Sequence, residues 1–269
     1  MRGAILALAM TALPGAGWAC IVPVHTQGEM PETIVEHGGT GIYRAWFDGP
    51  TTRYAHGVLG DAIEATELWA EAPTAANSCS VLNVRLDEAH VFEDVAPRLL
   101  DLDGDGAAEL IVVRSHRDLG AQLAIYGDAG DGAGLALIAS TPYIGRSNRW
   151  LAPIGAADLD GDGMIEIAYI DRPHLARTLR VWRYVPGGLA GQGHLAEVAS
   201  AGGLTNHRIG DPTIPGGIRD CGQGPEMVTA DAGWSRVIAT RLLPDGGLAA
   251  LDIGPWTAGA LNAALACPD

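Results

Sequence analysis

The chain has 269 residues, of which 48% are hydrophobic and 18% are charged, a composition typical of a globular protein rather than a disordered one. Its formal net charge at pH 7 is −15, and all 17 basic residues are arginines, because the sequence contains no lysine. The lack of lysine excludes a P-loop nucleotide site, a Schiff-base enzyme and a protein kinase. The negative charge argues against nucleic acids and anionic lipids as partners, since both would be repelled.

The N-terminus has the pattern of a secretory signal peptide. Arg2 is followed by an apolar run over residues 4–13 and then by small residues before a cleavage point after Ala19. We therefore expect residues 1–19 to be removed and residues 20–269 to form a single domain in the periplasm or outside the cell. Lipidation of Cys20 ranks second, because Trp18 stands where a small residue is favoured. No other apolar run approaches the ~20 residues of a transmembrane helix.

Four cysteines would remain after cleavage: Cys20, Cys79, Cys221 and Cys267. An even number in an oxidising compartment predicts two disulfides, for which three pairings are open. We favour Cys221–Cys267, which would tie the C-terminal tail to the last repeat, and Cys20–Cys79, which would tie down the new N-terminus. A metal site is the weaker interpretation, because no two cysteines have C-x-x-C spacing.

Two nearly identical acidic segments lie 57 residues apart. The first reads Asp-Leu-Asp-Gly-Asp-Gly-Ala-Ala-Glu over residues 101–109, and the second reads Asp-Leu-Asp-Gly-Asp-Gly-Met-Ile-Glu over residues 158–166. A degenerate third copy covers residues 220–226, and a vaguer echo of the preceding segment covers residues 53–61. Self-similarity at a fixed period indicates a repeat architecture.

Each repeat divides into four short strand-like runs, separated by turns rich in Asp, Gly and Pro. The runs cover residues 150–157, 165–170, 179–184 and 195–200 in one unit, and 95–100, 109–114, 122–126 and 135–139 in the unit before it. No long amphipathic helix is evident. Four strands per repeat predict an all-β fold, a β-propeller of about four four-stranded blades, or five if the N-terminal stretch contributes one.

A β-sandwich is the alternative fold, but it would not explain the repeat. In the propeller, residues 42–47 are the candidate for an extra strand that closes the ring with the last blade, because an open ring leaves sheet edges unpaired.

The acidic segments place carboxylates at positions 1, 3, 5 and 9 of a short loop. Calcium accepts six to eight oxygen ligands in loose geometry, and the alternative is an Asp-Gly turn without metal. Because closely spaced acids repel one another, an empty loop would be strained at neutral pH. We therefore expect calcium as the cofactor, held by Asp101, Asp103, Asp105, Glu109, Asp158, Asp160, Asp162 and Glu166. The third copy keeps only Asp220 and Glu226, and we expect a disulfide there instead of a metal.

Both D-L-D-G-D-G-x-x-E segments follow an Ala-Pro pair and an apolar run, and together they resemble the FG-GAP repeats of integrin α-chain propellers and the related VCBS repeats of bacterial secreted proteins. The resemblance covers about residues 50–255 and is strongest over 92–205. It implies a calcium-stiffened propeller that acts as a binding scaffold, and it implies no reaction. Two features depart from the family pattern: Glu109 and Glu166 replace the usual Asp, and the Phe-Gly-Gly element is missing.

Positive charge is concentrated in residues 172–183, which hold four arginines in twelve residues. Guanidinium groups suit carboxylates and phosphates, whereas the plainer interpretation is that they pair with carboxylates of their own blade. The candidate ligand contacts are Arg172, His174 and Arg177, with His207 and Arg208 from the adjacent blade.

Two functions remain open for such a face. The first is a non-enzymatic scaffold whose partner is a protein, a glycan or another envelope component. The second is a hydrolase or lyase that uses the arginines and histidines. No catalytic residue is assigned, because no nucleophile–base pair and no H-E-x-x-H or G-x-S-x-G motif is visible.

Overall fold

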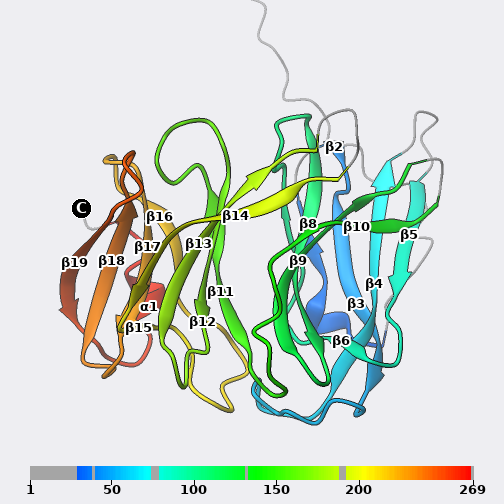
Figure 1. Ribbon diagram of the computed structural model, residues 1–269, viewed down its shortest axis with the longest axis horizontal. Coiled ribbons are helices and arrows are strands. Elements are labelled where there is room, and N and C mark those ends of the chain that lie inside the picture. The colour runs from blue at the N-terminus through cyan, green and yellow to red at the C-terminus, as the bar shows by residue number, and fades with distance from the viewer. Residues whose placement is uncertain (1–28, 38–39, 74–78, 131–132, 188–191, 268–269) are drawn as a thin grey trace, which may run out of the picture.

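The computed structural model describes residues 29–37, 40–73, 79–130, 133–187 and 192–267. Their strands form three hydrogen-bonded sheets that stand side by side in chain order, from right to left in Figure 1, and none of the sheets closes on itself. Within these ranges, the helices are limited to η1 (Pro31–Thr33) and α1 (Ala260–Ala263). The all-β class predicted from the sequence is confirmed. The expected signal peptide, residues 1–19, lies outside the described residues.

The first sheet has ten strands. They are β1 (Val35–Glu36), β2 (Thr40–Gly41), β3 (Arg44–Thr51), β4 (Glu64–Pro73), β5 (Cys79–Arg85), β6 (His90–Phe92), β7 (Arg98–Leu100), β8 (Ala107–His116), β9 (Gly120–Asp128) and β10 (Leu135–Ser140). The main path runs β1-β3-β4-β6-β8-β9-β10, with β5 beside β4 and both β2 and β7 beside β8. The short strand β6 pairs with both β4 and β8 and so joins two strand groups into one sheet.

The second sheet is a four-stranded antiparallel meander in the order β11-β12-β13-β14. Its strands are β11 (Leu151–Ala157), β12 (Glu166–Asp171), β13 (Thr178–Val185) and β14 (His194–Gly202). The third sheet has the order β15-β17-β18-β19, with β16 also paired to β17. Its strands are β15 (Leu204–Thr205), β16 (Gly217–Asp220), β17 (Pro225–Asp231), β18 (Arg236–Leu242) and β19 (Leu248–Pro255).

The predicted strands of the two best repeats agree with β7–β10 and β11–β14 to within three residues at each end. The prediction for residues 42–47 is wrong. Most of that segment belongs to β3, which hydrogen-bonds to β1 and β4 inside the first sheet rather than to a strand of the third. The alternation of apolar and polar residues identifies such a strand, but it does not identify its neighbour.

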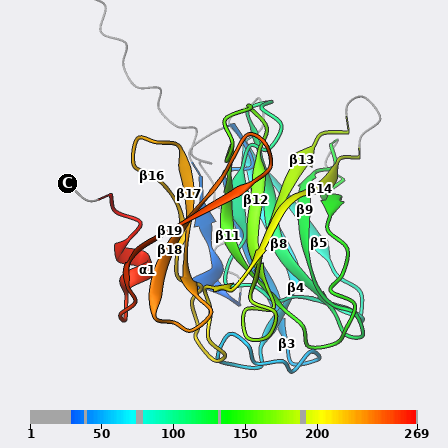
Figure 2. The ribbon, with the colours of Figure 1, turned by 60° about the vertical axis from the view of Figure 1, so that its left-hand side comes forward.

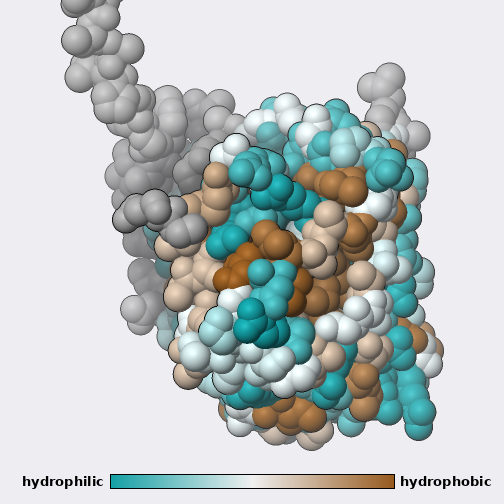
Figure 3. Space-filling model, turned by 90° about the vertical axis from the view of Figure 1, so that its left-hand side faces the viewer, coloured by the Kyte–Doolittle hydropathy of each residue, from teal (hydrophilic) through white to brown (hydrophobic). Residues whose placement is uncertain are grey.

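The core lies between neighbouring sheets as well as within them. One buried cluster combines Ile111 and Leu123 of the first sheet with Trp150, Ile167 and Tyr169 at the second. Figure 2 shows the three sheets from a second angle, with α1 packed beside the third. Figure 3 views the side of the third sheet, where apolar residues gather near the centre of the face. On the outer strand β19, the side chain of Leu251 is 61% exposed. No described helix has the length and apolar character of a membrane span.

Candidate functional site

The first acidic loop connects β7 to β8 at the upper edge of the molecule in Figure 1. The carboxylate of Asp101 accepts hydrogen bonds from the backbone nitrogens of Gly104 (2.7 Å) and Gly106 (2.9 Å). The side chain of Glu109, near the start of β8, accepts a hydrogen bond from the backbone nitrogen of Leu102 (2.8 Å). These bonds leave ligand oxygens of Asp101, Asp103 and Glu109 within 4.8 Å of one another.

The second acidic loop, between β11 and β12, repeats this hydrogen-bonding pattern. Asp158 accepts bonds from Gly161 (2.8 Å) and Gly163 (2.9 Å), and Glu166 accepts one from Leu159 (2.9 Å). Ligand oxygens of Asp158, Asp160 and Glu166 form the equivalent cluster. The clusters do not include Asp105 and Asp162, whose carboxylates each accept a hydrogen bond from the backbone nitrogen two residues further along.

The two loops differ in their surroundings, because an arginine of the neighbouring strand β13 reaches the second loop. Arg183 of β13 lies opposite Glu166 in the strand register and contacts Glu166 (2.5 Å), Asp160 (2.7 Å) and Asp162 (2.9 Å). In the first sheet, Tyr126 pairs with Leu110, so the residue opposite Glu109 is Gly127, which has no side chain. The second loop therefore has an internal cation, and the first does not.

The electrostatics follow from this difference. Burial raises the pKa of Glu109 to about 7, and the neighbouring Asp103 and Asp105 add to the shift. Burial also raises the pKa of Glu166, but the hydrogen bond from Arg183 opposes that shift. A cavity of about 340 Å³ borders the first loop, lined by Asp103, Asp105 and Glu109 together with Tyr184 of β13. Oxygen ligands that converge beside open space fit a hard divalent cation at the first loop, whereas at the second a cation would compete with Arg183.

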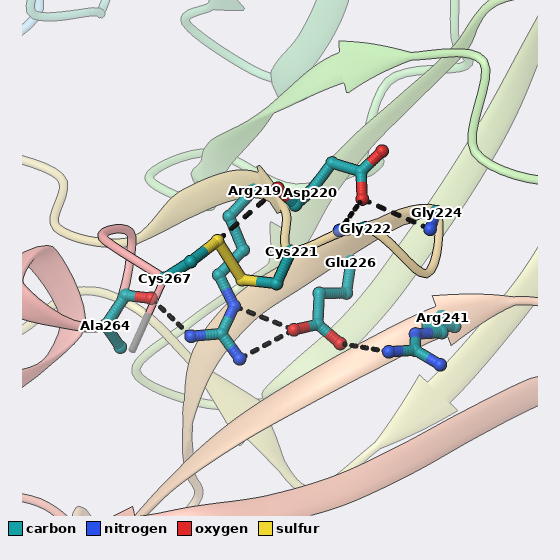
Figure 4. The surroundings of a disulfide bond; sticks show 9 residues. All are labelled: Arg219, Asp220, Cys221, Gly222, Gly224, Glu226, Arg241, Ala264 and Cys267. Atoms are coloured by element: carbon teal, nitrogen blue, oxygen red, sulfur yellow. Dashed lines mark hydrogen bonds and ion pairs between the residues drawn. A yellow bond between two sulfur atoms is a disulfide. The ribbon is translucent and has the colours of Figure 1, made fainter. Parts of the chain in front are cut away.

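In the third copy of the loop, between β16 and β17, Asp220 accepts hydrogen bonds from the backbone nitrogens of Gly222 and Gly224 through one oxygen (Figure 4). Glu226 pairs with Arg219 (2.6 Å) and with Arg241 (3.2 Å), a residue of β18 in the place that Arg183 has in β13. Cys221 in this loop forms a disulfide with Cys267, with their Cα atoms 5.4 Å apart. The other expected pair, Cys20–Cys79, involves Cys20, which lies outside the described residues.

The basic segment 172–183 does not form one face. Arg172 precedes β13 and Arg183 lies near the far end of this strand, so most of its length lies between the two residues. Arg180 pairs with Asp171 (3.1 Å) and Glu197 (2.6 Å) on the flank of the sheet. Four arginines close in sequence are therefore distributed over the length of the sheet, because an extended chain rises about 3.3 Å per residue.

Arg177 and Arg208 have different surroundings from each other and from the other arginines. The backbone of Arg177 has φ +51°, and its carbonyl accepts hydrogen bonds from Gly203 and Leu204. The guanidinium of Arg208 lies over the rings of Trp234 and Trp256, 4.3 Å from each centroid, a cation–π arrangement that fixes the side chain on the third sheet.

His174 and His207 do meet. The Nε2 atom of His174 lies 3.0 Å from Nδ1 of His207, and Nε2 of His207 lies 2.9 Å from the carbonyl oxygen of Asp211. Because a carbonyl only accepts, His207 donates through Nε2 and accepts through Nδ1, and His174 donates through Nε2. Burial lowers the pKa of His174 to about 4, and it also lowers the pKa of His207. Both rings are therefore neutral at pH 7.

A pocket of about 170 Å³, which we call the histidine pocket, lies beside this pair at the ends of the sheets away from the acidic loops. Loops of the first and second sheets meet here, including the loop between β3 and β4 at the lower edge of Figure 1. The lining residues are His56, Asn148, Arg149, Trp150, Arg172, His174, Leu175 and Ile209. Of the five predicted ligand contacts, Arg172 and His174 line the pocket. His207 does not line it but hydrogen-bonds to His174.

One lining residue, His56, pairs with a buried carboxylate that the sequence analysis missed. Nδ1 of His56 lies 2.5 Å from Oε1 of Glu93, whose side chain is fully buried and also bonds to Ser115. The indole of Trp150 donates to the carbonyl oxygen of Glu93 (2.8 Å). His56 and Glu93 are 37 residues apart, and no local sequence signal connects them.

Glu64, at the start of β4, belongs to the same buried acidic region. Burial raises its pKa to about 9, and the charge of the neighbouring Glu93 adds to the shift, so Glu64 is protonated at neutral pH. The unfolded chain releases this proton near pH 4.5, so the folded state binds more protons between pH 4.5 and 9 and stability falls as the pH rises through that window.

Replacing Glu64 with Gln should therefore stabilise the protein at pH 9 relative to the parent by roughly 1–3 kcal/mol and flatten the pH dependence. Urea unfolding at pH 6 and pH 9 measures the effect. Glu32→Gln, which also removes one carboxylate but at an exposed position, is the matched control. An identical slope in the parent and in Glu64→Gln would contradict the prediction.

Comparison with known proteins is informative for one part of the chain. Residues 101–169 match the family model of the FG-GAP-like repeat, which confirms the resemblance seen in the sequence. The match begins at the first acidic loop and ends within β12, after the second. No curated protein matches the chain. An FG-GAP repeat in an all-β chain indicates a β-propeller-like interaction domain.

Proposed function

We propose that the chain is an exported β-propeller of the FG-GAP type, which binds calcium at its first acidic loop and acts as a non-enzymatic binding scaffold. The observation that carries the proposal is the first acidic loop, where three carboxylates converge without an internal cation. That loop opens the segment matched by the FG-GAP-like repeat. A bound cation would offset the mutual repulsion of these acids and hold β7 and β8 together.

The arrangement of the strands supports about four blades. The groups β7–β10, β11–β14 and β16–β19 each place a loop of the acidic series between their first two strands. The group β3–β5 with β1 would supply a fourth blade, merged with the next one through β6. A disulfide on a chain with a signal-like N-terminus supports an oxidising location, periplasmic or secreted.

The separation of the predicted contact residues favours a scaffold over the alternative hydrolase or lyase. Asp171 is occupied by Arg172 and Arg180, and Arg208 is held between two tryptophans. His174 and His207 hydrogen-bond to each other rather than to a nucleophile. The histidine pocket, which Arg172 and His174 line, still offers charge and apolar area to a partner, which is what a protein, a glycan or another envelope component would contact.

Removing calcium should lower the melting temperature by about 5–10 °C, because a ligand at 100 times its Kd stabilises the folded state by about 2.7 kcal/mol. Differential scanning calorimetry in about 1 mM calcium and in excess EDTA measures the difference in melting temperature. Asp103→Asn should remove most of the response, since Asp103 belongs to the first cluster.

The matched variant is Asp160→Asn, which changes the same position of the second loop. Because Arg183 already supplies a cation to three carboxylates of that loop, the variant should keep most of the response to EDTA. Equal melting temperatures in calcium and EDTA, in a protein free of bound metal, would refute the calcium part of the proposal.

A further inference from the structure

The histidine pocket carries positive charge that the described residues do not neutralise. Arg149 donates to the carbonyl oxygen of Asn148 (2.8 Å) and forms no ion pair within the described part of the chain. Arg172 uses Nε and Nη2 on Asp171 (2.8 and 2.9 Å), which leaves its Nη1 without a hydrogen bond among the same residues. In a chain of net charge −15, an arginine in a pocket without an acidic partner stands out.

Three of the other lining residues, Trp150, Leu175 and Ile209, are apolar. Trp150 is 2% exposed, and its ring stacks against that of His174, with an interplanar angle of 11°. Leu175 and Ile209 contribute side chains that are 63% and 70% exposed. Exposed aliphatic side chains that border the same pocket as an unpaired arginine provide an apolar wall next to a cation.

The backbone of the pocket is held in an unfavourable conformation. Asn148 and Arg172 have φ values of +52° and +48°, and they are two of the four non-glycine residues with positive φ in the described ranges. Such conformations cost about 1–3 kcal/mol each and persist only where the surroundings impose them, most often at functional sites. Here the nitrogen of Asn148 donates to the hydroxyl of Tyr54 (3.2 Å), and that of Arg172 donates to the carbonyl oxygen of Trp150 (2.9 Å).

The size of the pocket limits its ligand. Sites for drug-sized molecules measure about 300–1,000 Å³, so a pocket of about 170 Å³ accepts a single small group. A carboxylate fits the forked donors of arginine, and a short apolar substituent fits Trp150, Leu175 and Ile209. Because His174 is neutral and donates to His207, its Nδ1 remains an acceptor and adds no second charge.

We propose that the histidine pocket binds a carboxylate that carries a small apolar group, with Arg149 as the principal cation. This inference rests on the binding role proposed above and gives that role a ligand chemistry. The same chemistry is present in a free carboxylic acid and in the C-terminal residue of a partner protein. The experiment separates these two sources.

Isothermal titration calorimetry with benzoate should show saturable binding, and benzamide, which has the same shape without the charge, should bind at least about tenfold more weakly. Arg149→Gln should weaken benzoate binding by about tenfold or more. The matched control is Arg146→Gln, which removes an exposed arginine of the same loop that does not line the pocket and should leave the affinity unchanged. Equal affinities for benzoate and benzamide, no binding of benzoate, or wild-type affinity in Arg149→Gln would overturn the proposal.

A peptide that ends in phenylalanine, tested with a free and with an amidated C-terminus, separates the two sources. Tighter binding of the free-acid peptide than of benzoate identifies a protein terminus, and tighter binding of benzoate identifies a free acid.

Repeating the titration in EDTA distinguishes failure of the calcium scaffold from failure of the pocket, since the pocket contains no acidic loop residue. Incubation with ethyl benzoate tests for turnover: release of benzoate and ethanol would contradict the non-enzymatic role while supporting recognition of the acid.

Discussion

Replacing Trp150 with alanine is expected to lower the free energy of unfolding by about 3–5 kcal/mol. The side chain is 2% exposed and lies in the cluster that joins the first sheet to the second. Its indole N–H also donates to the carbonyl oxygen of Glu93, which directly follows β6. The substitution therefore removes a large apolar side chain and leaves a buried acceptor without its donor. Urea unfolding followed by circular dichroism measures the loss.

Two further variants separate these contributions. Trp150→Phe keeps an aromatic ring but loses the hydrogen bond, and we expect it to cost about 1–2 kcal/mol in addition to a small packing change. Trp256→Ala removes a partly exposed tryptophan and should cost less than Trp150→Ala. If Trp150→Ala and Trp256→Ala have the same effect, Trp150 does not hold the two sheets together.

Replacing both Cys221 and Cys267 with alanine is expected to destabilise the protein by about 2–4 kcal/mol. The disulfide closes a loop with a sequence separation of 46 residues, so its removal frees the unfolded chain from a long-range constraint. In the folded state it holds the tail next to β16, where Arg219 donates to the carbonyl oxygen of Ala264 (2.5 Å).

The urea midpoint of the double variant provides the test. Arg219→Gln is a useful companion, because it removes the polar contact to the tail but keeps the covalent bond, and it should cost less than the double variant. A midpoint unchanged in the double alanine variant would show that the third sheet holds the tail without the disulfide.

The strands of the middle repeats could be predicted from the sequence because their signal is local. Residues 167–170 form a short apolar run, residues 178–181 alternate between polar and apolar, and segments rich in Asp, Gly and Pro separate the strands. The joining of two strand groups through β6 could not be predicted. The three residues of β6 pair with β8, and Phe92 also pairs with Ala65 of β4. Nothing in the sequence near Ala65 or Phe92 specifies the other residue.

The same distinction applies to the sites. The acidic loops are contiguous, and their spacing alone identifies them as candidate cation sites. Arg183, in contrast, is close to Arg172 in sequence, but strand β13 places Arg183 at the acidic end of the sheet, where it contacts Glu166. The pair of His56 and Glu93 is assembled from two loops, and only the folded chain brings these residues together.

The arginine opposite the last acid of the loop bears on how the repeats could diverge after duplication. Where the strand carries arginine, as at Arg183 and Arg241, each loop glutamate has a covalently attached counter-charge, and the supply of ions in the surroundings matters less to that unit. A unit of this kind tolerates the loss of its aspartates, and the third copy, which keeps Asp220 and Glu226, shows such a loop. Where the strand carries glycine, as at Gly127, the calcium ion that we propose would supply the counter-charge from solution. If calcium binds as proposed, a single codon separates a repeat that carries its own counter-charge from one that takes it from the surrounding solution.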